Sequence, residues 1–351
     1  MLHGVLTRIF RHRLLLLFGV CLSLFISLTL SLGFSPLLYR ACCSPKESPV
    51  RMAAPERPPA LNDRPVVGVL AQEAWPPRTQ HGSNYIVASY VKFLESAGAR
   101  VVPIRVNRSE AEYERLFYSI NSLLLPGGCV DLQDSEYARA AKFLYHLAIK
   151  ANDRGDYFPV WGTCLGFEEL LVLVAGHNML IKSSGTTKVT ARPINLTSGA
   201  TRSRMYQDFP LWLLQAMTTE PLAAFNHICC LPLEIFQKDE KLKKFYRLLS
   251  TNKDDNGLEF VSSVEAIEYP FYGVQWHPEK NPYEWKPNYR YPHSHNAVRA
   301  TFHFAEFIVS EARRNQHSFE NADEEIKALI YQHPVKNAAA FSCFQQVYFF
   351  D

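Results

Sequence analysis

The chain has 351 residues, of which 47% are hydrophobic and 20% are charged, and its formal net charge is +3 at pH 7. A chain of this length and apolar content can bury a substantial core, so the composition excludes wholesale disorder. The small net charge gives no support to a nucleic-acid-binding scaffold or to a polybasic protein that binds membranes.

The N-terminus has the pattern of a secretory leader. Arg8, Arg11 and Arg13 precede an apolar run from Leu14 to Phe34, which is the order of a cationic region and an apolar region in such leaders. We therefore assign residues 1–34 to a signal peptide, or to a signal anchor because the run is long enough to span a bilayer. Either interpretation places the rest of the chain in a lumen or outside the cell, with membrane attachment only if the leader stays uncleaved.

Two further features fit that compartment. Asn107 and Asn195 each begin an Asn-X-Ser/Thr triplet without proline, so both are predicted N-glycosylation acceptors. None of the eight cysteines forms a Cys-X-X-Cys pair, which removes the usual sign of a zinc site. From Cys129 onward their number is odd, so at least one thiol is expected to be free and to need a functional explanation.

After the leader, the chain divides into a linker and one folded domain. Residues 35–64 are rich in proline and are predicted to be an extended linker or a processed segment. In the predicted domain, residues 65–351, apolar runs of strand character alternate with amphipathic helical patterns. The strand runs are residues 65–70, 101–106, 122–125 and 158–161, and the helical patterns cover residues 86–97, a segment capped by Ser109 and Glu112, and a long segment ending near Asn152.

The remainder of the domain has a looser pattern. Residues 265–275 are predicted to form two strands that meet near Pro270, residues 298–312 a closing helix, and residues 344–350 a last edge strand. Apolar strands alternating with helices predict an α/β fold with a mostly parallel central sheet and helices on both faces. In such a fold the reactive groups gather at the carboxyl ends of the strands.

The strongest local motif is Gly162-Thr163-Cys164-Leu165-Gly166, directly after a predicted strand and before a helix over residues 167–174. This is a nucleophile elbow with cysteine in the position of serine. The helix N-terminus favours a thiolate at Cys164, and the backbone N–H of Leu165 is placed to stabilise an oxyanion. The alternative is a buried structural cysteine beside a glycine turn.

The second motif puts His277 just beyond a strand, with Glu279 two residues later. A thiol nucleophile needs a base that takes its proton and returns it to the leaving amine, and that base needs an acidic partner. We assign these roles to His277 and Glu279. The alternative is a surface His-X-Glu without function.

The third motif is Pro126-Gly127-Gly128 at the end of another strand. Glycines at such a point let backbone N–H groups approach a ligand, so Gly127 and Gly128 are candidate oxyanion donors beside Leu165. A plain turn is the alternative for this motif alone. Together, three strand ends supply a nucleophile, a base with its orienting acid, and an oxyanion loop.

These motifs, in this order, resemble the class I glutamine amidotransferase fold, and the fuller resemblance is to the γ-glutamyl hydrolase family, also called folate γ-glutamyl hydrolase. It rests on residues 161–170 (WGTCLGFEEL), 272–285, 203–205 and 344–346, and it extends over residues 65–351. The resemblance implies a cysteine-type hydrolase in which Cys164 is the nucleophile, His277 the proton donor and acceptor, and Glu279 the third member. It further implies folylpoly-γ-glutamate as a small-molecule substrate, no metal or organic cofactor, no nucleic-acid partner, a homodimer, and a lysosomal or secreted location.

The sequence departs from the family at one place. Members typically carry Asn-Phe-His, whereas this chain has Phe225-Asn226-His227 followed by Ile228-Cys229-Cys230. His227 keeps its place and is a candidate substrate-binding residue, with a structural histidine as the alternative. The altered segment leaves open an inactive γ-glutamyl-ligand-binding protein of the same fold. An amidotransferase-type glutaminase is the other alternative, but it would need a synthase partner, and the leader argues against it.

Overall fold

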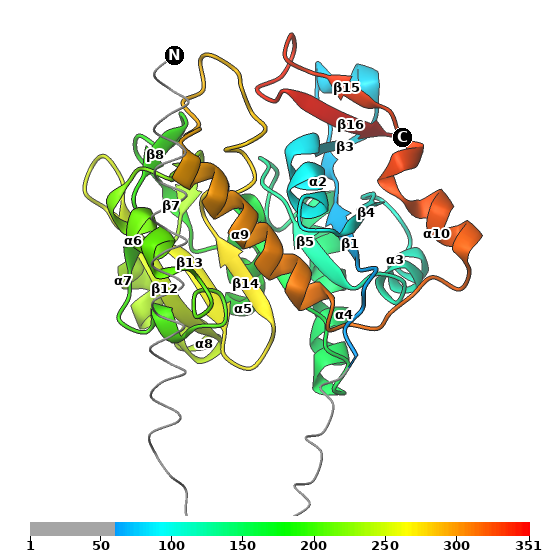
Figure 1. The fold of residues 1–351 in the computed structure, drawn as a ribbon, viewed down its shortest axis with the longest axis horizontal. Coiled ribbons are helices and arrows are strands. Elements are labelled where there is room, and N and C mark those ends of the chain that lie inside the picture. The colour runs from blue at the N-terminus through cyan, green and yellow to red at the C-terminus, as the bar shows by residue number, and fades with distance from the viewer. Residues whose placement is uncertain (1–59) are drawn as a thin grey trace, which may run out of the picture. The chain divides into compact units, whose positions relative to one another are not determined.

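The structure is a computed structural model that describes residues 60–351 (Figure 1). The predicted leader and nearly all of the predicted linker therefore lie outside the described residues. Within residues 60–351, no helix is both long enough and apolar enough to cross a bilayer.

An eight-stranded sheet forms the centre of the fold, in the strand order β4-β1-β5-β6-β14-β13-β12-β9. The first five strands in this order run parallel to one another, and the last three add antiparallel pairs. The mostly parallel sheet that the sequence predicts is confirmed. The strands are β4 (Arg100–Ile104), β1 (Val66–Leu70), β5 (Ser122–Leu125), β6 (Val160–Thr163), β14 (Phe271–Val274), β13 (Glu259–Ala266), β12 (Tyr246–Lys253) and β9 (Asn195–Leu196).

Two hydrophobic cores lie on the two faces of this sheet. Side chains alternate along a strand, so Val67 and Val69 of β1 enter one core while Val66 and Leu70 enter the other. Helices α2 (Ala88–Glu95), α6 (Leu211–Thr219) and α9 (His295–Ala312) pack on the first, and α9 crosses that face in Figure 1. The second is covered by α3 (Glu110–Phe117), α4 (Glu136–Asp153), α5 (Leu165–Ala175), α7 (Leu233–Lys238) and α8 (Glu240–Phe245). Helices therefore cover both faces, as predicted.

A separate four-stranded sheet corrects two of the predictions. Its order is β15 (Val335–Asn337), β16 (Gln346–Phe350), β3 (Asn84–Val87) and β2 (Gln72–Glu73). The predicted edge strand is wrong in position, because β16 lies between β15 and β3 and pairs with both. Residue 86, predicted to be helical, lies in β3 opposite Tyr348, because pairing with the distant C-terminus outweighs the local helical pattern.

Short elements complete the fold. Two small antiparallel pairs join β8 (Thr190–Arg192) to β10 (Ala223–Phe225) and β7 (Ile181–Lys182) to β11 (Cys229–Cys230). The other short helices are α10 (Ala322–Ala328), η1 (Arg78–His81), η2 (Ala200–Arg202) and η3 (Ile330–Gln332).

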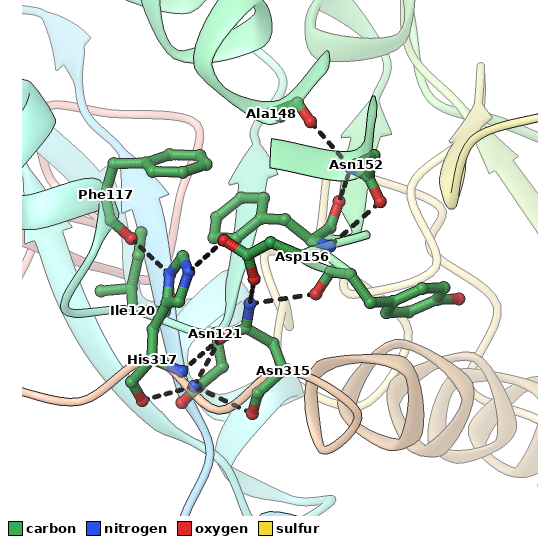
Figure 2. A network of polar contacts seen from close by, with 10 residues as sticks. Phe117, Ile120, Asn121, Ala148, Asn152, Asp156, Asn315 and His317 are labelled. Carbon is green, nitrogen blue, oxygen red and sulfur yellow. Dashed lines mark hydrogen bonds and ion pairs between the residues drawn. The ribbon is translucent and has the colours of Figure 1, made fainter. Parts of the chain in front are cut away.

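A buried polar network ties the start of β1 to the segment after α9, and Figure 2 shows the part of it around Asn121, Asn315 and His317. Asn121 accepts a hydrogen bond from the Val66 N–H at 2.8 Å, and its amide donates to Asn315 Oδ1 at 2.9 Å and to the His317 carbonyl at 2.8 Å. His317 Nε2 lies 2.8 Å from a carboxylate oxygen of Asp156. This network joins the start of β1 to the segment that follows α9, at the opposite edge of the sheet from the carboxyl ends of the parallel strands.

Replacing Asn121 with aspartate is expected to lower the free energy of unfolding by about 3 kcal/mol at pH 7. The amide that donates to Asn315 Oδ1 and to the His317 carbonyl would become a buried carboxylate oxygen, which cannot donate to either acceptor. Urea unfolding measures the loss. The exposed Asn256, whose side chain makes no hydrogen bond within residues 60–351, is the control for the same change. Equal losses in the two variants would contradict the role of the network.

Candidate active site

The three sequence motifs meet at one cavity. Strands β5, β6 and β14 are neighbours in the sheet, and the predicted site residues follow their carboxyl ends. A cavity of about 380 Å³ is lined there by Gly127, Gly128, Cys164, Leu165 and His277. This is the edge of a parallel sheet at which ligand sites are expected.

The turn that carries Cys164 is tight and strained. Cys164 has φ 53° and ψ −110°, a left-handed value that a residue with a side chain rarely adopts. The flanking glycines are required by space: a Cβ on Gly166 would lie 2.0 Å from the Leu125 carbonyl oxygen, and one on Gly162 would lie 2.6 Å from the Gly166 carbonyl oxygen. The elbow therefore presents the sulfur at the N-terminus of α5, toward the cavity.

Cys164 and His277 both lie against Gly127. A Cβ on Gly127 would lie 2.7 Å from His277 Cε1 and 3.2 Å from Cys164 Cβ. Both side chains thus approach a single point that only glycine leaves open. The structure brings the predicted nucleophile and base to the same place.

His277 is oriented by a fully buried carboxylate. Its Nδ1 lies 2.9 Å from Glu279 Oε1, and because a carboxylate accepts, the proton is on Nδ1 and Nε2 is the basic nitrogen. Burial alone would raise the pKa of Glu279, but His277 and then Lys280 outweigh it and hold that pKa below its usual range. An ionised Glu279 stabilises a charged imidazole.

Tyr90 is a site residue that the sequence pattern missed. Its hydroxyl accepts a hydrogen bond from the Gly127 N–H at 2.7 Å and lies 3.4 Å from His277 Nδ1. The helical hydropathy pattern treats this tyrosine as an apolar core residue and carries no sign of the hydroxyl contact. The Gly127 N–H therefore already has a hydrogen-bond partner in Tyr90, whereas the sequence predicted this N–H as an oxyanion donor.

The other two predicted oxyanion donors are differently placed. The Leu165 N–H is hydrogen-bonded to the Cys164 sulfur and lowers the pKa of that thiol. The Gly128 N–H donates no hydrogen bond to any other group in residues 60–351. Both residues line the cavity beside Cys164, but the Leu165 N–H, like that of Gly127, already has a partner, whereas the Gly128 N–H does not.

The resting thiol differs from the thiolate that a helix N-terminus alone predicts. Burial raises the pKa of Cys164 well above its usual value, the Glu168 carboxylate raises it further, and the Leu165 N–H opposes them more weakly. Glu168 is itself buried, which raises its pKa to about 8, while Gln275 donates to it at 2.8 Å. Below about pH 8 Glu168 is therefore neutral and its effect on the thiol is absent.

The segment that departs from the family pattern borders the nucleophile. The Cys164 thiol donates to the Asn226 carbonyl at 3.5 Å. His227 lines the cavity, and its Nδ1 contacts the Cys229 carbonyl at 2.7 Å, so Nε2 is left as an acceptor without a partner in residues 60–351. Burial lowers the pKa of His227 to about 4, which keeps the ring neutral at neutral pH.

The cavity holds an unusual number of thiols. Cys129, Cys229 and Cys343 line it together with Cys164, and all the cysteines among the described residues are free. No group of three or more His, Cys, Asp or Glu side chains is arranged to hold a metal within residues 60–351. The predicted glycosylation acceptors Asn107 and Asn195 are exposed, and neither lines the cavity.

Comparison with known proteins identifies the family. A family model described as Peptidase C26 matches residues 65–279. Gamma-glutamyl hydrolase of Mus musculus is 51% identical over 290 residues, which cover 83% of this chain and 90% of the mouse protein. This chain belongs to the γ-glutamyl hydrolase family. The resemblance that the motifs indicated is confirmed.

Two further matches are a second relative and a solved structure. The Homo sapiens gamma-glutamyl hydrolase is 51% identical over 82% of this chain and 90% of its own length. Among solved structures, the glutaminase domain of Trypanosoma brucei CTPS with bound acivicin is 13% identical, with a TM-score of 0.47 over 72% of this chain and 96% of that one. That likeness is too slight to carry an argument.

Replacing Glu168 with glutamine is expected to speed alkylation of Cys164 about ten-fold at pH 9 and to leave the rate within about two-fold of wild type at pH 6. At pH 9 the wild-type carboxylate is charged and disfavours the thiolate, whereas at pH 6 it is neutral. Mass spectrometry of the peptide that contains Cys164 measures the rate. Glu169→Gln is the control, and an equal effect at both pH values would contradict the expectation.

Glu169 generates a separate prediction for stability. Both its carboxylate oxygens are buried without a hydrogen-bond partner in the described chain, and burial raises its pKa to about 8. The unfolded state loses this proton from about pH 4.5 upward and the folded state only near pH 8, so wild-type stability falls across that window. Glu169→Gln removes the effect and should gain up to about 1.4 kcal/mol per pH unit relative to wild type.

Thermal or urea unfolding at pH 5 and pH 8 checks this expectation. A difference between Glu169→Gln and wild type that stays constant from pH 5 to pH 8 would show that the folded state ionises this carboxyl normally.

Proposed function

We propose that this protein hydrolyses the γ-glutamyl amide bonds of folylpoly-γ-glutamates through a thioester on Cys164. The observation that carries the proposal is the meeting of Cys164 and His277 against Gly127 in one cavity, with Glu279 2.9 Å from His277 Nδ1. Membership of the γ-glutamyl hydrolase family supports the same reaction. A thiol, a base and a buried acid in this order are the machinery of acyl transfer.

The first half of the reaction forms the thioester. His277 Nε2 takes the Cys164 proton as the sulfur attacks the γ-carbonyl carbon, and the resulting imidazolium is stabilised by ionised Glu279. In this proposal the negative oxygen of the tetrahedral intermediate accepts from the Gly128 N–H, and from the Leu165 N–H once that amide leaves the sulfur. His277 then returns its proton to the leaving amine as the carbon–nitrogen bond breaks.

The second half releases the acid. His277, again neutral, takes a proton from a water molecule that attacks the thioester carbonyl. The carbon–sulfur bond breaks, the γ-carboxyl product leaves, and the proton on His277 restores the Cys164 thiol. The raised pKa of that thiol favours the neutral resting form to which the cycle returns.

A binding protein without activity is the second candidate. The observation in its favour is the altered segment from Phe225 to Cys230, whose Asn226 carbonyl accepts the hydrogen bond of the Cys164 thiol. The Cys164 thiol must break its hydrogen bond to the Asn226 carbonyl before it can donate its proton to His277. Intact Cys164, His277 and Glu279 oppose this candidate.

The proposed location is the secretory pathway, ending in the lysosome or outside the cell. It rests on the leader in residues 1–34 and on the exposed acceptors Asn107 and Asn195. A homodimer is part of the proposal on the family resemblance alone.

Release of glutamate from folyl-tetra-γ-glutamate tests the reaction. Cys164→Ala should reduce kcat by roughly 10⁴-fold or more, because the covalent route is lost, while Cys129→Ala, which changes another thiol of the cavity, should keep most of the activity. Hydroxylamine should trap the wild-type intermediate as a γ-glutamyl hydroxamate. A wild type no faster than Cys164→Ala would leave the binding protein as the function.

A further inference from the structure

The proposed substrate carries many carboxylates, so the cavity needs positive charge. Each glutamate of a γ-linked chain keeps a free α-carboxylate, and each glutamate except the last uses its γ-carboxyl in an amide. Two basic side chains line the cavity within residues 60–351, those of Arg78 and Lys280. The acidic side chains that line it are Asp131 and Glu168. Arg78 and Lys280 differ in whether the protein itself already neutralises their charge.

Lys280 is already neutralised by the protein. Its side chain is almost fully buried, and its Nζ lies 3.5 Å from Glu279 and 3.6 Å from Glu284. It also donates to Ser89 Oγ at 3.1 Å. A buried cation between two buried carboxylates stabilises those carboxylates, and a third anion would have to displace one of them.

Arg78, unlike Lys280, has no carboxylate partner in the described part of the chain. It is half-buried in η1 and forms no ion pair with any carboxylate in residues 60–351. Its guanidinium stands 4.9 Å from the centre of the Tyr85 ring, 5.4 Å from that of Phe344 and 5.7 Å from that of Trp75. Its Nη1 donates to the Tyr85 hydroxyl at 3.0 Å.

These contacts hold the charge in place without cancelling it. Aromatic rings attract a guanidinium and exclude water from it, and neither effect satisfies its N–H donors. Its Nη2 also donates long hydrogen bonds to Ser342 Oγ at 3.5 Å and to Cys343 Sγ at 4.0 Å, and neither acceptor is charged. A fixed guanidinium whose hydrogen-bond partners are all neutral matches the two oxygens of a carboxylate, which is a stronger acceptor.

We infer that Arg78 binds an α-carboxylate of the γ-glutamyl substrate and thereby selects γ-linked chains. The inference rests on the proposed function and names the residue that would recognise the substrate class. In an α-linked chain the α-carboxyl is consumed in the peptide bond, so Arg78 would lose its ligand. Arg78 acts in recognition and has no part in proton transfer.

The test compares two matched substrates, one with free α-carboxylates and one in which the α-carboxylates flanking the scissile bond are carboxamides. Arg78→Gln should raise KM for the carboxylate substrate about 10- to 100-fold, the range for losing a charge-assisted hydrogen-bonded pair, with little change in kcat. Wild type and Arg78→Gln should have equal KM for the carboxamide substrate. Arg78→Lys keeps the charge without the planar donor pair and should fall between them.

Arg299 provides the matched control. It is an exposed arginine on α9 that stands 5.3 Å from the centre of the Trp212 ring and does not line the cavity. Arg299→Gln should leave both KM values unchanged. Calorimetric binding of tetra-γ-glutamate to Cys164→Ala protein, with and without Arg78→Gln, gives a second measurement that needs no turnover.

Two results would overturn the inference. An equal rise in KM for both substrates would mean that Arg78 only supports the cavity wall, and an unchanged KM together with unchanged tetra-γ-glutamate binding would mean that it has no role. A wild type that binds tetra-γ-glutamate through Arg78 but hydrolyses nothing would instead refute the proposed reaction, so the two failures are distinct.

Discussion

The backbone N–H of Cys164 donates to the carbonyl of Val274 at 2.9 Å, and the arrangement of the site depends on this bond. It is the last rung of the parallel pairing between β6 and β14, in which Thr163 lies opposite Val274. Neighbouring strands are about 4.8 Å apart, so this pairing sets the separation of the two chain segments that carry nucleophile and base. Loop residues then only have to turn each side chain toward the other.

The interior around this pair carries more acid than base. Glu168, Glu169, Glu279 and Glu284 are all buried, and Lys280 is the buried lysine that meets two of them. Protonation reduces this excess of negative charge, because burial raises the pKa of Glu168 and of Glu169 to about 8. Below about pH 8 both are neutral, so neither offsets the guanidinium of Arg78 at the cavity.

Local sequence was sufficient where the chemistry is local. The elbow at Cys164 and the pair His277–Glu279 could be predicted, because each depends on glycines, a strand end and a spacing of two residues. Tyr90 and Arg78 could not, because their roles depend on contacts with Gly127 and Tyr85 that only the folded chain creates. The raised pKa of the Cys164 thiol could not be predicted for a related reason, because the motif does not show how deeply the sulfur is buried.

The same distinction applies to the fold. Apolar runs alternating with helical patterns predicted the parallel sheet and the helices on both of its faces, since β1, β4, β5 and β6 are short and almost completely buried. The predicted place of the C-terminal strand was wrong, because nothing near Tyr348 indicates that its partner is residue 86. Pairing between segments this far apart depends on tertiary structure.

The thiols around the cavity have a consequence for chemical probes. An electrophile that enters to react with Cys164 encounters the sulfur atoms of Cys129, Cys229 and Cys343 on the walls, and Cys129 is exposed at the surface. A group attached to any of them takes up space in the cavity, so inactivation by a small thiol reagent does not identify the nucleophile. Selectivity for Cys164 has to come from the glutamyl-like shape and charge of an inhibitor, whatever its reactive group.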